Sequence, residues 1–450
     1  MSNNQLEKKY GLSTAIAMVV GVVIGSGVFF KAEAVLNKTA GNMPMGILAW
    51  LIVGAVMIVC SYVFATMANR YEKVSGLVDY AEATVGSRYA YLMGWFSAVI
   101  YTPCLVSAVA WIAARYVCVL LGWDIAGGAC MTIAAFFLIG CYALNTLSAK
   151  LAGRFQVTTT VIKMIPLLLM AVIGTIAGLR SGMLVQNFNT ATTAGEGGSL
   201  MAAAVSVAFA YEGWVLATSI NAELKDAKKN LPIALVGGAF IVVLTYVLYY
   251  IGLSGAVTTA EMMASGQAAA KHAFQTIFGG FAGTLIFVLV VISCLGTLNG
   301  LILSGCRSFY ALGIRGEGPR PDMMKQVDPV TNIPTNSSIA SLMVNMAWLL
   351  YFYGAVVDFG WFGNFSFDSS ELPGITLYAM YVPMFIGLMR KAKGLNTFQR
   401  IITPVLGIAG CGFMVYAAFA GYGVSTVLHY LVIYAVIMGI GNCFYKKEEA

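Results

Sequence analysis

Two interruptions in long apolar runs are the places where this chain could do chemistry. The first run contains Ile24-Gly25-Ser26-Gly27, and two glycines around a serine weaken a helix at that point. A helix broken inside a bilayer frees backbone N–H and C=O groups, which are tolerated only where they line a cavity or bind a ligand. An amino acid zwitterion suits both ends, because its carboxylate can meet the N–H groups of the second half-helix and its ammonium the carbonyls of the first. The same glycines could instead form a close-packing notch against a neighbouring helix.

A second interruption, Phe209-Ala210-Tyr211-Glu212-Gly213-Trp214, places a carboxylate and a glycine between aromatic residues deep in another apolar run. Inverted-repeat transporters bind substrate where two broken spans, one from each half, face each other. Glu212 could accept a hydrogen bond from a substrate amine, carry a proton, or be neutralised by a polar neighbour for structure alone. Phe209 is expected to shape a side-chain pocket. Substrate contacts are therefore predicted for Ile24, Gly25, Ser26, Gly27, Phe209, Ala210, Glu212 and Gly213.

Four further charged residues lie in or beside apolar runs. Lys163 lies within Val161-Ile162-Lys163-Met164-Ile165-Pro166, where a lysine is costly and is expected to face the bundle interior with a partner. Alternatively, Lys163 lies near a helix end and its ammonium reaches the membrane–water interface. Arg115, Asp368 and Glu371 lie at the expected outer ends of spans, where they could form a gate of opposite charges or remain separate and solvated.

The elements that position these residues must be membrane helices. Of the 450 residues, 59% are hydrophobic and only 10% are charged, against about 25% charged in soluble proteins. This composition excludes a soluble enzyme, a secreted disulfide-rich domain and a disordered protein. The apolar runs are about 20 residues or longer, which favours helices over the alternating ten-residue strands of a barrel. Neither a metal-ligand cluster nor a nucleophile–base pair is seen among the histidines and the nine cysteines, so we expect neither enzymatic activity nor a metal or other cofactor.

The apolar runs predict twelve spans in one membrane domain. Their centres lie near Ile24, Val56, Val106, Phe137, Leu168, Phe209, Val242, Leu289, Met346, Met380, Val405 and Ala435. With the N-terminus in the cytoplasm, most of the 26 lysines and arginines fall on the cytoplasmic side, as the positive-inside rule demands. We therefore expect a multi-pass protein of the cell membrane with both termini cytoplasmic. The net charge of +7 reflects this topology and predicts no nucleic acid partner.

Several motifs, in order along the chain, resemble one known superfamily. The string Gly21-Val22-Val23-Ile24-Gly25-Ser26-Gly27-Val28-Phe29 is similar to the first helix of the amino acid–polyamine–organocation superfamily. The sixth-span string around Glu212, with Lys229-Asn230-Leu231-Pro232 after it, and Ser293-Cys294-Leu295-Gly296-Thr297-Leu298-Asn299-Gly300 also match. The branch most similar is that of the L-type amino acid transporters and bacterial serine/threonine exchangers. Glu212 departs from the Asp, Gly, Ala or small polar residue common at its position.

The resemblance implies an all-α LeuT-type fold of twelve transmembrane helices, a five-plus-five inverted repeat with helices 1 and 6 broken. One transport domain would cover residues 1–450, with repeats at about 11–180 and 200–392 and extra helices 11 and 12 at about 398–445. It also implies amino acid transport by alternating access, as exchange or proton-linked uptake. Small to medium neutral L-amino acids are the first candidate substrates. Glu212 and an acidic outer rim leave cationic amino acids or amines open.

Two more expectations come from the resemblance. Lys163 matches a lysine that stands where related carriers hold a sodium ion, against the first helix break and Ser293, so sodium-independent transport is expected. Light-chain members of the family bind a heavy chain through a cysteine in the outer loop after span three. In this chain the first cysteine there, Cys130, falls at the expected start of span four, so no disulfide-linked heavy chain is expected.

Overall fold

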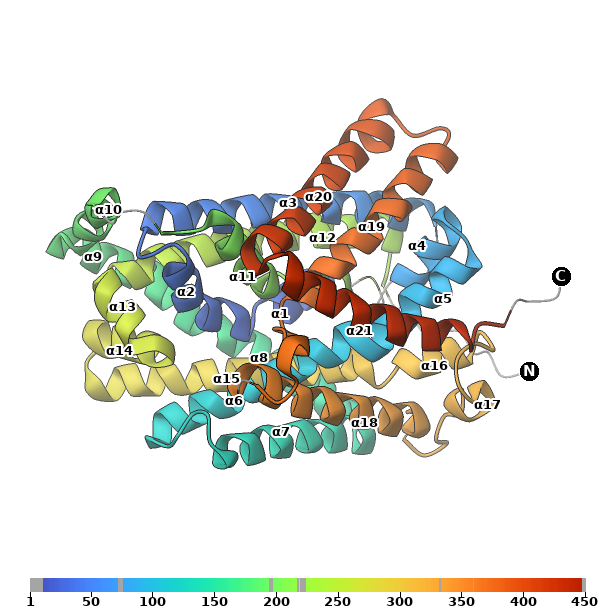
Figure 1. Ribbon diagram of the computed structural model, residues 1–450, viewed down its shortest axis with the longest axis horizontal. Coiled ribbons are helices and arrows are strands. Elements are labelled where there is room, and N and C mark those ends of the chain that lie inside the picture. The colour runs from blue at the N-terminus through green and yellow to red at the C-terminus, as the bar shows by residue number, and fades with distance from the viewer. Residues whose placement is uncertain are drawn as a thin grey trace.

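The structure is a computed structural model that describes residues 11–71, 76–193, 197–216, 218, 224–331, 333–358 and 360–446. It is a bundle of helices, many of which run along one long axis (Figure 1). The α-helices of the first half are α1 (Leu12–Val23), α2 (Ser26–Lys38), α3 (Met43–Arg70), α4 (Leu77–Thr84), α5 (Ser87–Phe96), α6 (Thr102–Leu121), α7 (Gly128–Leu147), α8 (Ala149–Leu169), α9 (Thr175–Ser181), α10 (Met183–Thr193) and α11 (Leu200–Ala210).

The second half contains α12 (Ala227–Ser254), α13 (Thr259–Ser265), α14 (Ala269–Phe278), α15 (Gly280–Gly305), α16 (Ser308–Gly313), α17 (Pro321–Met324), α18 (Thr335–Phe352), α19 (Leu372–Lys391), α20 (Thr403–Tyr422) and α21 (Val424–Asn442). Short π-helical or 3-10 segments are η1 (Ser97–Tyr101), η2 (Met170–Gly174), η4 (Gly266–Ala268), η5 (Tyr353–Val357), η6 (Gly363–Phe365) and η7 (Phe398–Ile402).

Ten helices in the described part of the chain are long and apolar enough to cross a membrane. They are Met43–Arg70, Ser87–Leu121, Gly128–Leu147, Leu151–Ser181, Ala227–Ser254, Gly280–Gly313, Thr335–Val357, Leu372–Lys391, Phe398–Tyr422 and Val424–Asn442. Ala15–Val23 and Gly27–Lys38 add an eleventh if they form one span bent by 42°. Leu200–Leu216 is apolar but shorter, and its helix would reach about 26 Å against about 30 Å of hydrocarbon. The difference from the twelve predicted spans therefore lies in the two interrupted runs.

The interrupted helices lie at the centre of the bundle. α1 packs against α12, α11 packs against α2, and α15 packs against both α6 and α8. In the span Ser87–Leu121, which includes α6, 72% of the apolar window is buried, whereas in Val424–Asn442 it is 22%. α6 therefore belongs to the core around the interruptions, whereas α21 is mostly exposed and crosses the near face of the bundle in Figure 1.

Glycines allow the two interruptions to approach each other and their neighbours. α1 ends at Val23 because Ile24 adopts an extended backbone, with φ −70° and ψ 108°, and α2 begins at Ser26. A side chain at Gly25 would overlap the hydroxyl of Thr297 on α15, and a Cβ at Gly27 would lie 2.6 Å from the Cα of Ala210. After α11 ends at Ala210, Gly213 has a φ of +95°, a conformation that favours glycine. The glycines predicted to weaken these helices thus also bring the two breaks into contact.

Candidate functional site

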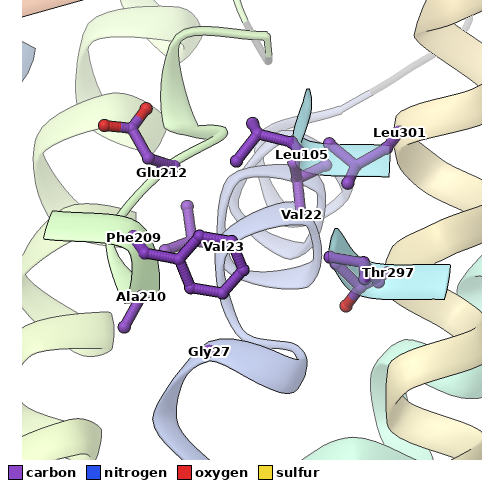
Figure 2. A pocket seen from close by; sticks show the side chains of 10 residues that line it. Val22, Val23, Gly27, Leu105, Phe209, Ala210, Glu212, Thr297 and Leu301 are labelled. Carbon is purple, nitrogen blue, oxygen red and sulfur yellow. The ribbon is translucent and has the colours of Figure 1, made fainter. Parts of the chain in front are cut away.

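A cavity lies where α1, α2 and α11 end or begin. It is small, about 20 Å³, and Val22, Val23, Gly27, Leu105, Val109, Phe209, Ala210, Glu212, Thr297 and Leu301 line it (Figure 2). Four of the predicted substrate contacts, Gly27, Phe209, Ala210 and Glu212, are therefore together. Ile24, Gly25 and Ser26 lie directly before Gly27 in the chain, and Gly213 directly follows Glu212. Most of the lining is apolar.

Polar backbone groups meet the cavity at the first interruption. The first N–H groups of a helix have no intrahelical acceptor, and α2 begins with Ser26 and Gly27. The carbonyls near the end of α1 accept hydrogen bonds from two buried side chains. Lys163 Nζ donates to the Gly21 carbonyl at 2.6 Å, and the Tyr246 hydroxyl donates to the Val23 carbonyl at 2.8 Å. The end of α1 is thus held by α8 and α12.

Lys163 is fully buried on α8 and faces the bundle interior. Besides the Gly21 carbonyl, its Nζ lies 3.4 Å from the Thr297 hydroxyl on α15. The sequence predicts Ser293 as the hydroxyl partner, and this is wrong: the Ser293 hydroxyl is buried without a hydrogen-bond partner among the described residues. Ser293 and Thr297 are four residues apart and therefore lie on one face of α15. The observed partner is thus on the predicted face of the helix, but one turn further along.

Glu212 is buried at the second interruption. The Tyr101 hydroxyl donates to its Oε2, and the Gly213 N–H donates to the Tyr101 oxygen at 3.3 Å. Its Oε1 has no hydrogen-bond partner among the described residues and lies against α19, where a Cβ at Gly374 would come within 2.7 Å of it. Figure 2 shows this carboxylate turned away from the ring of Phe209. One oxygen is therefore satisfied by a tyrosine, and the other lies in a space that only glycine leaves open.

A buried ion pair lies beyond Phe209. Lys31 Nζ on α2 is 2.5 Å from Glu371 Oε1, next to the start of α19, and the two side chains are 3% and 5% exposed. The Tyr422 hydroxyl on α20 donates to the second carboxylate oxygen of Glu371. Lys31 Nζ also lies 5.0 Å from the centre of the Phe209 ring, within the range of a cation–π interaction. This pair joins the first interrupted span to α19 and α20, next to the aromatic side chain that closes the cavity.

Among the described residues no ion pair joins Arg115 to Asp368 or Glu371, whose gate the sequence leaves open beside separate, solvated ends. Arg115 lies over the ring of Trp111, 4.6 Å from its centre, and interacts electrostatically with Glu33. Asp368 instead accepts hydrogen bonds from the N–H and hydroxyl of Ser370. The reason is helix geometry: Lys31 and Glu33 are two residues apart on α2 and so lie on different faces, which directs one toward Glu371 and the other toward Arg115.

A second charged cluster lies between α4 and the turn that follows α16. Arg315 forms ion pairs with Glu82 at 2.9 Å, Glu317 at 3.2 Å and Asp79 at 3.5 Å. Burial alone would lower the pKa of the Arg315 guanidinium, but the hydrogen bond to Glu82 and the charge of Glu317 raise it. The cluster therefore ties α4 to the segment after α16.

Several residues of the site carry no strong sequence signal. Tyr101, Tyr246 and Thr297 are common residues in membrane helices, and their roles depend on contacts between distant parts of the chain. Lys31 could have been found, because it lies four residues after Gly27 in an apolar stretch and therefore on the same helix face.

Comparison with known proteins gives consistent matches along the whole chain. The family model described as amino acid permease matches residues 10–442. The serine/threonine exchanger SteT of Bacillus subtilis (strain 168) is 28% identical, over 92% of this chain and 91% of its own length. The b(0,+)-type amino acid transporter 1 of Homo sapiens is 26% identical, over 89% of this chain and 80% of its own.

A solved structure shares the fold. The crystal structure of MhsT in complex with L-phenylalanine superimposes with a TM-score of 0.61 and 15% sequence identity, covering 96% of this chain and 99% of that one. The relatives found by sequence are named as transporters and exchangers, and not as enzymes. 

Proposed function

The chain belongs to the amino acid permease family of multi-pass membrane transporters, and on this premise we propose that it is a sodium-independent secondary transporter of small to medium neutral L-amino acids. It works by alternating access, as an exchanger or a proton-linked carrier. The cavity between the ends of α1, α2 and α11 supports this function most directly, because it combines the N-terminus of α2, which no side chain caps among the described residues, with a mostly apolar lining. The relative SteT, named as a serine/threonine exchanger, acts on substrates of this class.

The substrate binds across the first interruption in this proposal. Its carboxylate meets the N–H groups at the start of α2 near Gly25, Ser26 and Gly27, and its ammonium meets carbonyls near Ile24 and Ala210. The side chain enters the apolar part of the cavity, which Leu105, Val109, Phe209 and Leu301 help to line. That lining favours a neutral side chain over a charged one, since an unpaired charge there would lose its hydration.

The proposed architecture is a LeuT-type five-plus-five inverted repeat of twelve spans in one transport domain. The repeats cover about 11–180 and 200–392, the extra helices about 398–445, and the first and sixth spans are the broken ones. Ten single helices, the bent pair α1 and α2, and the short apolar helix that starts at Leu200 together fit this count. The protein lies in the cell membrane with both termini in the cytoplasm.

Lys163 replaces a coupling sodium ion in this proposal. Its ammonium lies between the Gly21 carbonyl and the Thr297 hydroxyl, with Ser293 one turn away on α15. A fixed positive charge among such oxygens repels a cation and fulfils its structural role. Lys163 would thereby link the end of α1 to α15 without sodium.

Alternating access needs a closure at each end of the cavity. We assign the outer closure to the Lys31–Glu371 pair with Phe209 beneath it, and the inner one to the cluster around Arg315. Asp368 holds the turn that precedes Glu371, and Arg115 with Glu33 supports α2 from its other face.

A second candidate is the transport of cationic amino acids or amines. It is favoured by one observation: Glu212 lines the cavity, and its Oε1 has no hydrogen-bond partner among the described residues. A substrate with a basic side chain could supply that partner.

No disulfide-linked heavy chain is part of the proposed assembly. Cys130 is buried in the first turn of α7, where its thiol is not positioned to bond another chain. The test of this point is the mass of the protein purified from its native membrane without reducing agent, which should equal that of the single chain.

The deciding experiment is uptake of radiolabelled substrates into proteoliposomes. Neutral, basic and decarboxylated amino acids are compared, with sodium or choline outside, and with the vesicles empty or preloaded with unlabelled amino acid. Neutral L-amino acids should be taken up equally in both salts. A requirement for sodium, or uptake of basic substrates alone, would contradict the proposal, and dependence on preloading would separate exchange from net uptake.

A further inference from the structure

A groove on the membrane-facing surface lies away from the transport cavity. Its volume is about 440 Å³, and it is lined by Tyr62, Ala65, Thr66, Asn69, Pro232, Ile233, Val236, Gly237 and Gln399. These residues come from the last turns of α3, the first turns of α12 and the segment η7 that precedes α20. None of them lines the cavity between the two interruptions.

We propose that this groove binds one anionic phospholipid, with an acyl chain against α3 and α12 and the phosphate at their ends. The lining of the groove is mostly apolar, and Asn69 at the end of α3 and Gln399 in η7 add polar groups; this end of the groove is here called its mouth. From Tyr62 to Asn69 it follows α3 for about 10 Å, which is most of one leaflet of hydrocarbon about 15 Å thick. Its shape therefore matches the part of a lipid that lies just below the headgroup.

Small residues and a proline form the groove. Pro232 lies within the first turns of α12, and Ala65 and Gly237 present little side chain to the space. A Cβ at Gly237 would meet no atom of the described residues within 4 Å, so none of the described helices fills the space beside it. Tyr62 packs edge-on against Phe398, with ring centres 5.8 Å apart, and this contact joins α3 to η7 at the groove.

The charges around the mouth argue for an anionic headgroup. Arg70 is the last residue of α3, next to Asn69, and Arg400 follows Gln399. Lys229 lies four residues before Ile233 and seven before Val236, so it shares their face of α12. The connection from Met389 to Ile402 contains four basic residues and neither Asp nor Glu.

The backbone holds these bases at the mouth. The Arg70 guanidinium donates to the Lys393 carbonyl at 3.3 Å, and Arg400 Nε donates to the Met389 carbonyl at 2.9 Å. Arginine has five N–H donors, so both side chains keep donors for phosphate oxygens. Basic pockets between membrane helices on the cytoplasmic side commonly bind anionic lipid headgroups.

The test is native mass spectrometry of the purified full chain with added phosphatidylglycerol or phosphatidylcholine. We expect one phosphatidylglycerol to be retained in preference to phosphatidylcholine. Arg70→Gln and Lys229→Gln should each lower the phosphatidylglycerol affinity about fivefold, the effect of one basic residue near a lipid surface. Arg154→Gln is the matched control, because Arg154 is an exposed base on α8 outside the groove.

A second variant tests the groove itself. Gly237→Phe would place a ring in this space and should abolish retention, whereas Gly140→Phe on α7, where an added Cβ also meets nothing within 4 Å among the described residues, should not. Equal retention of the two lipids, or equal losses in Arg70→Gln and Arg154→Gln, would overturn the proposal. Unchanged retention of phosphatidylglycerol in Gly237→Phe would also overturn the proposal. A protein that is dimeric in the parent and monomeric in Gly237→Phe would overturn it as well, because a second copy of the chain would then cover the groove.

Discussion

The two interruptions at the centre of the bundle are each stabilised by a buried charged side chain, a lysine at the first and a glutamate at the second. The two side chains contact different groups. At the first, the Lys163 ammonium donates to the Gly21 carbonyl, so the charge acts on the backbone of the interrupted helix itself. At the second, the Glu212 carboxylate accepts a hydrogen bond from Tyr101 and lies against Gly374, so it joins the interruption to neighbouring helices.

This difference separates the two regions by function. The backbone groups at the first interruption open onto the cavity, and Lys163 determines where the end of α1 lies. The Glu212 carboxylate turns away from Phe209 (Figure 2), toward Tyr101 and α19. We therefore expect changes at the first interruption to impair transport more than changes at the second.

The largest effect is expected from Gly27→Val. A Cβ there would lie 2.6 Å from the Ala210 Cα, and backbone cannot move aside as a flexible side chain could. The added side chain would also cover the N–H groups at the start of α2, so substrate binding should be lost. Binding of a radiolabelled neutral amino acid to the purified variant measures this.

The control for Gly27→Val is Gly140→Val, because a Cβ at Gly140 meets open space. Both variants are checked for a single monodisperse peak in size-exclusion chromatography. Unchanged affinity in a monodisperse Gly27→Val variant would mean that the substrate does not bind at the first interruption.

The next effect concerns Lys31, on the outer half of the first interrupted span. Removing one partner of a buried ion pair costs about 3–5 kcal/mol. If the pair forms only in the outward-closed state, Lys31→Met should shift the equilibrium toward outward-open forms by about 100-fold or more. A cysteine introduced at Val109 in the cavity should then react faster with a membrane-impermeant thiol reagent.

Arg115→Met in the same Val109→Cys background is the comparison for Lys31→Met, because Arg115 faces Glu33 instead of Glu371. It should leave the labelling rate close to that of the parent. Equal labelling of both variants would show that the buried pair is a structural contact and not a gate.

The sequence identified the family and the helical membrane fold, and it predicts both interruptions. These follow from features that are local in the chain: long apolar runs, and glycines beside polar residues at Gly25 and Gly213. The partners of the charged residues could not be predicted in the same way. The partners of Lys163 and Glu371 depend on how helices distant in the chain are rotated about their axes. A shift by one helical turn, or a rotation to another face, is enough to change which side chain is the partner.

The third effect is expected from Lys163→Ala, which leaves the Gly21 carbonyl without its charged donor. A lost buried hydrogen bond of this kind costs about 1–3 kcal/mol, so turnover should fall about tenfold or more while substrate affinity changes less. Initial rates and binding constants in proteoliposomes, with sodium or choline outside, measure both quantities. Lys271→Ala is the matched control, because Lys271 also donates to a backbone carbonyl, that of Val119, outside the cavity. Full activity of Lys163→Ala would exclude a coupling role for this lysine. Recovery of activity only when sodium is present would mean that a sodium ion can take the place of the removed ammonium.

The smallest effect is expected from Glu212→Gln, at the second interruption. Glutamine keeps an oxygen for the Tyr101 hydroxyl and fits beside Gly374, so one buried hydrogen bond replaces another and neutral amino acid uptake should change by only about threefold. Tyr101→Phe, which removes the donor and leaves the carboxylate, should have an effect of similar size if the contact is structural. Uptake of a neutral and a basic amino acid by the parent and both variants measures this. If Glu212→Gln loses neutral amino acid uptake and Tyr101→Phe does not, the charge of Glu212 itself is required. The second interruption would then affect transport more than the first, contrary to the expected order. Selective loss of basic uptake would assign the carboxylate to a cationic side chain.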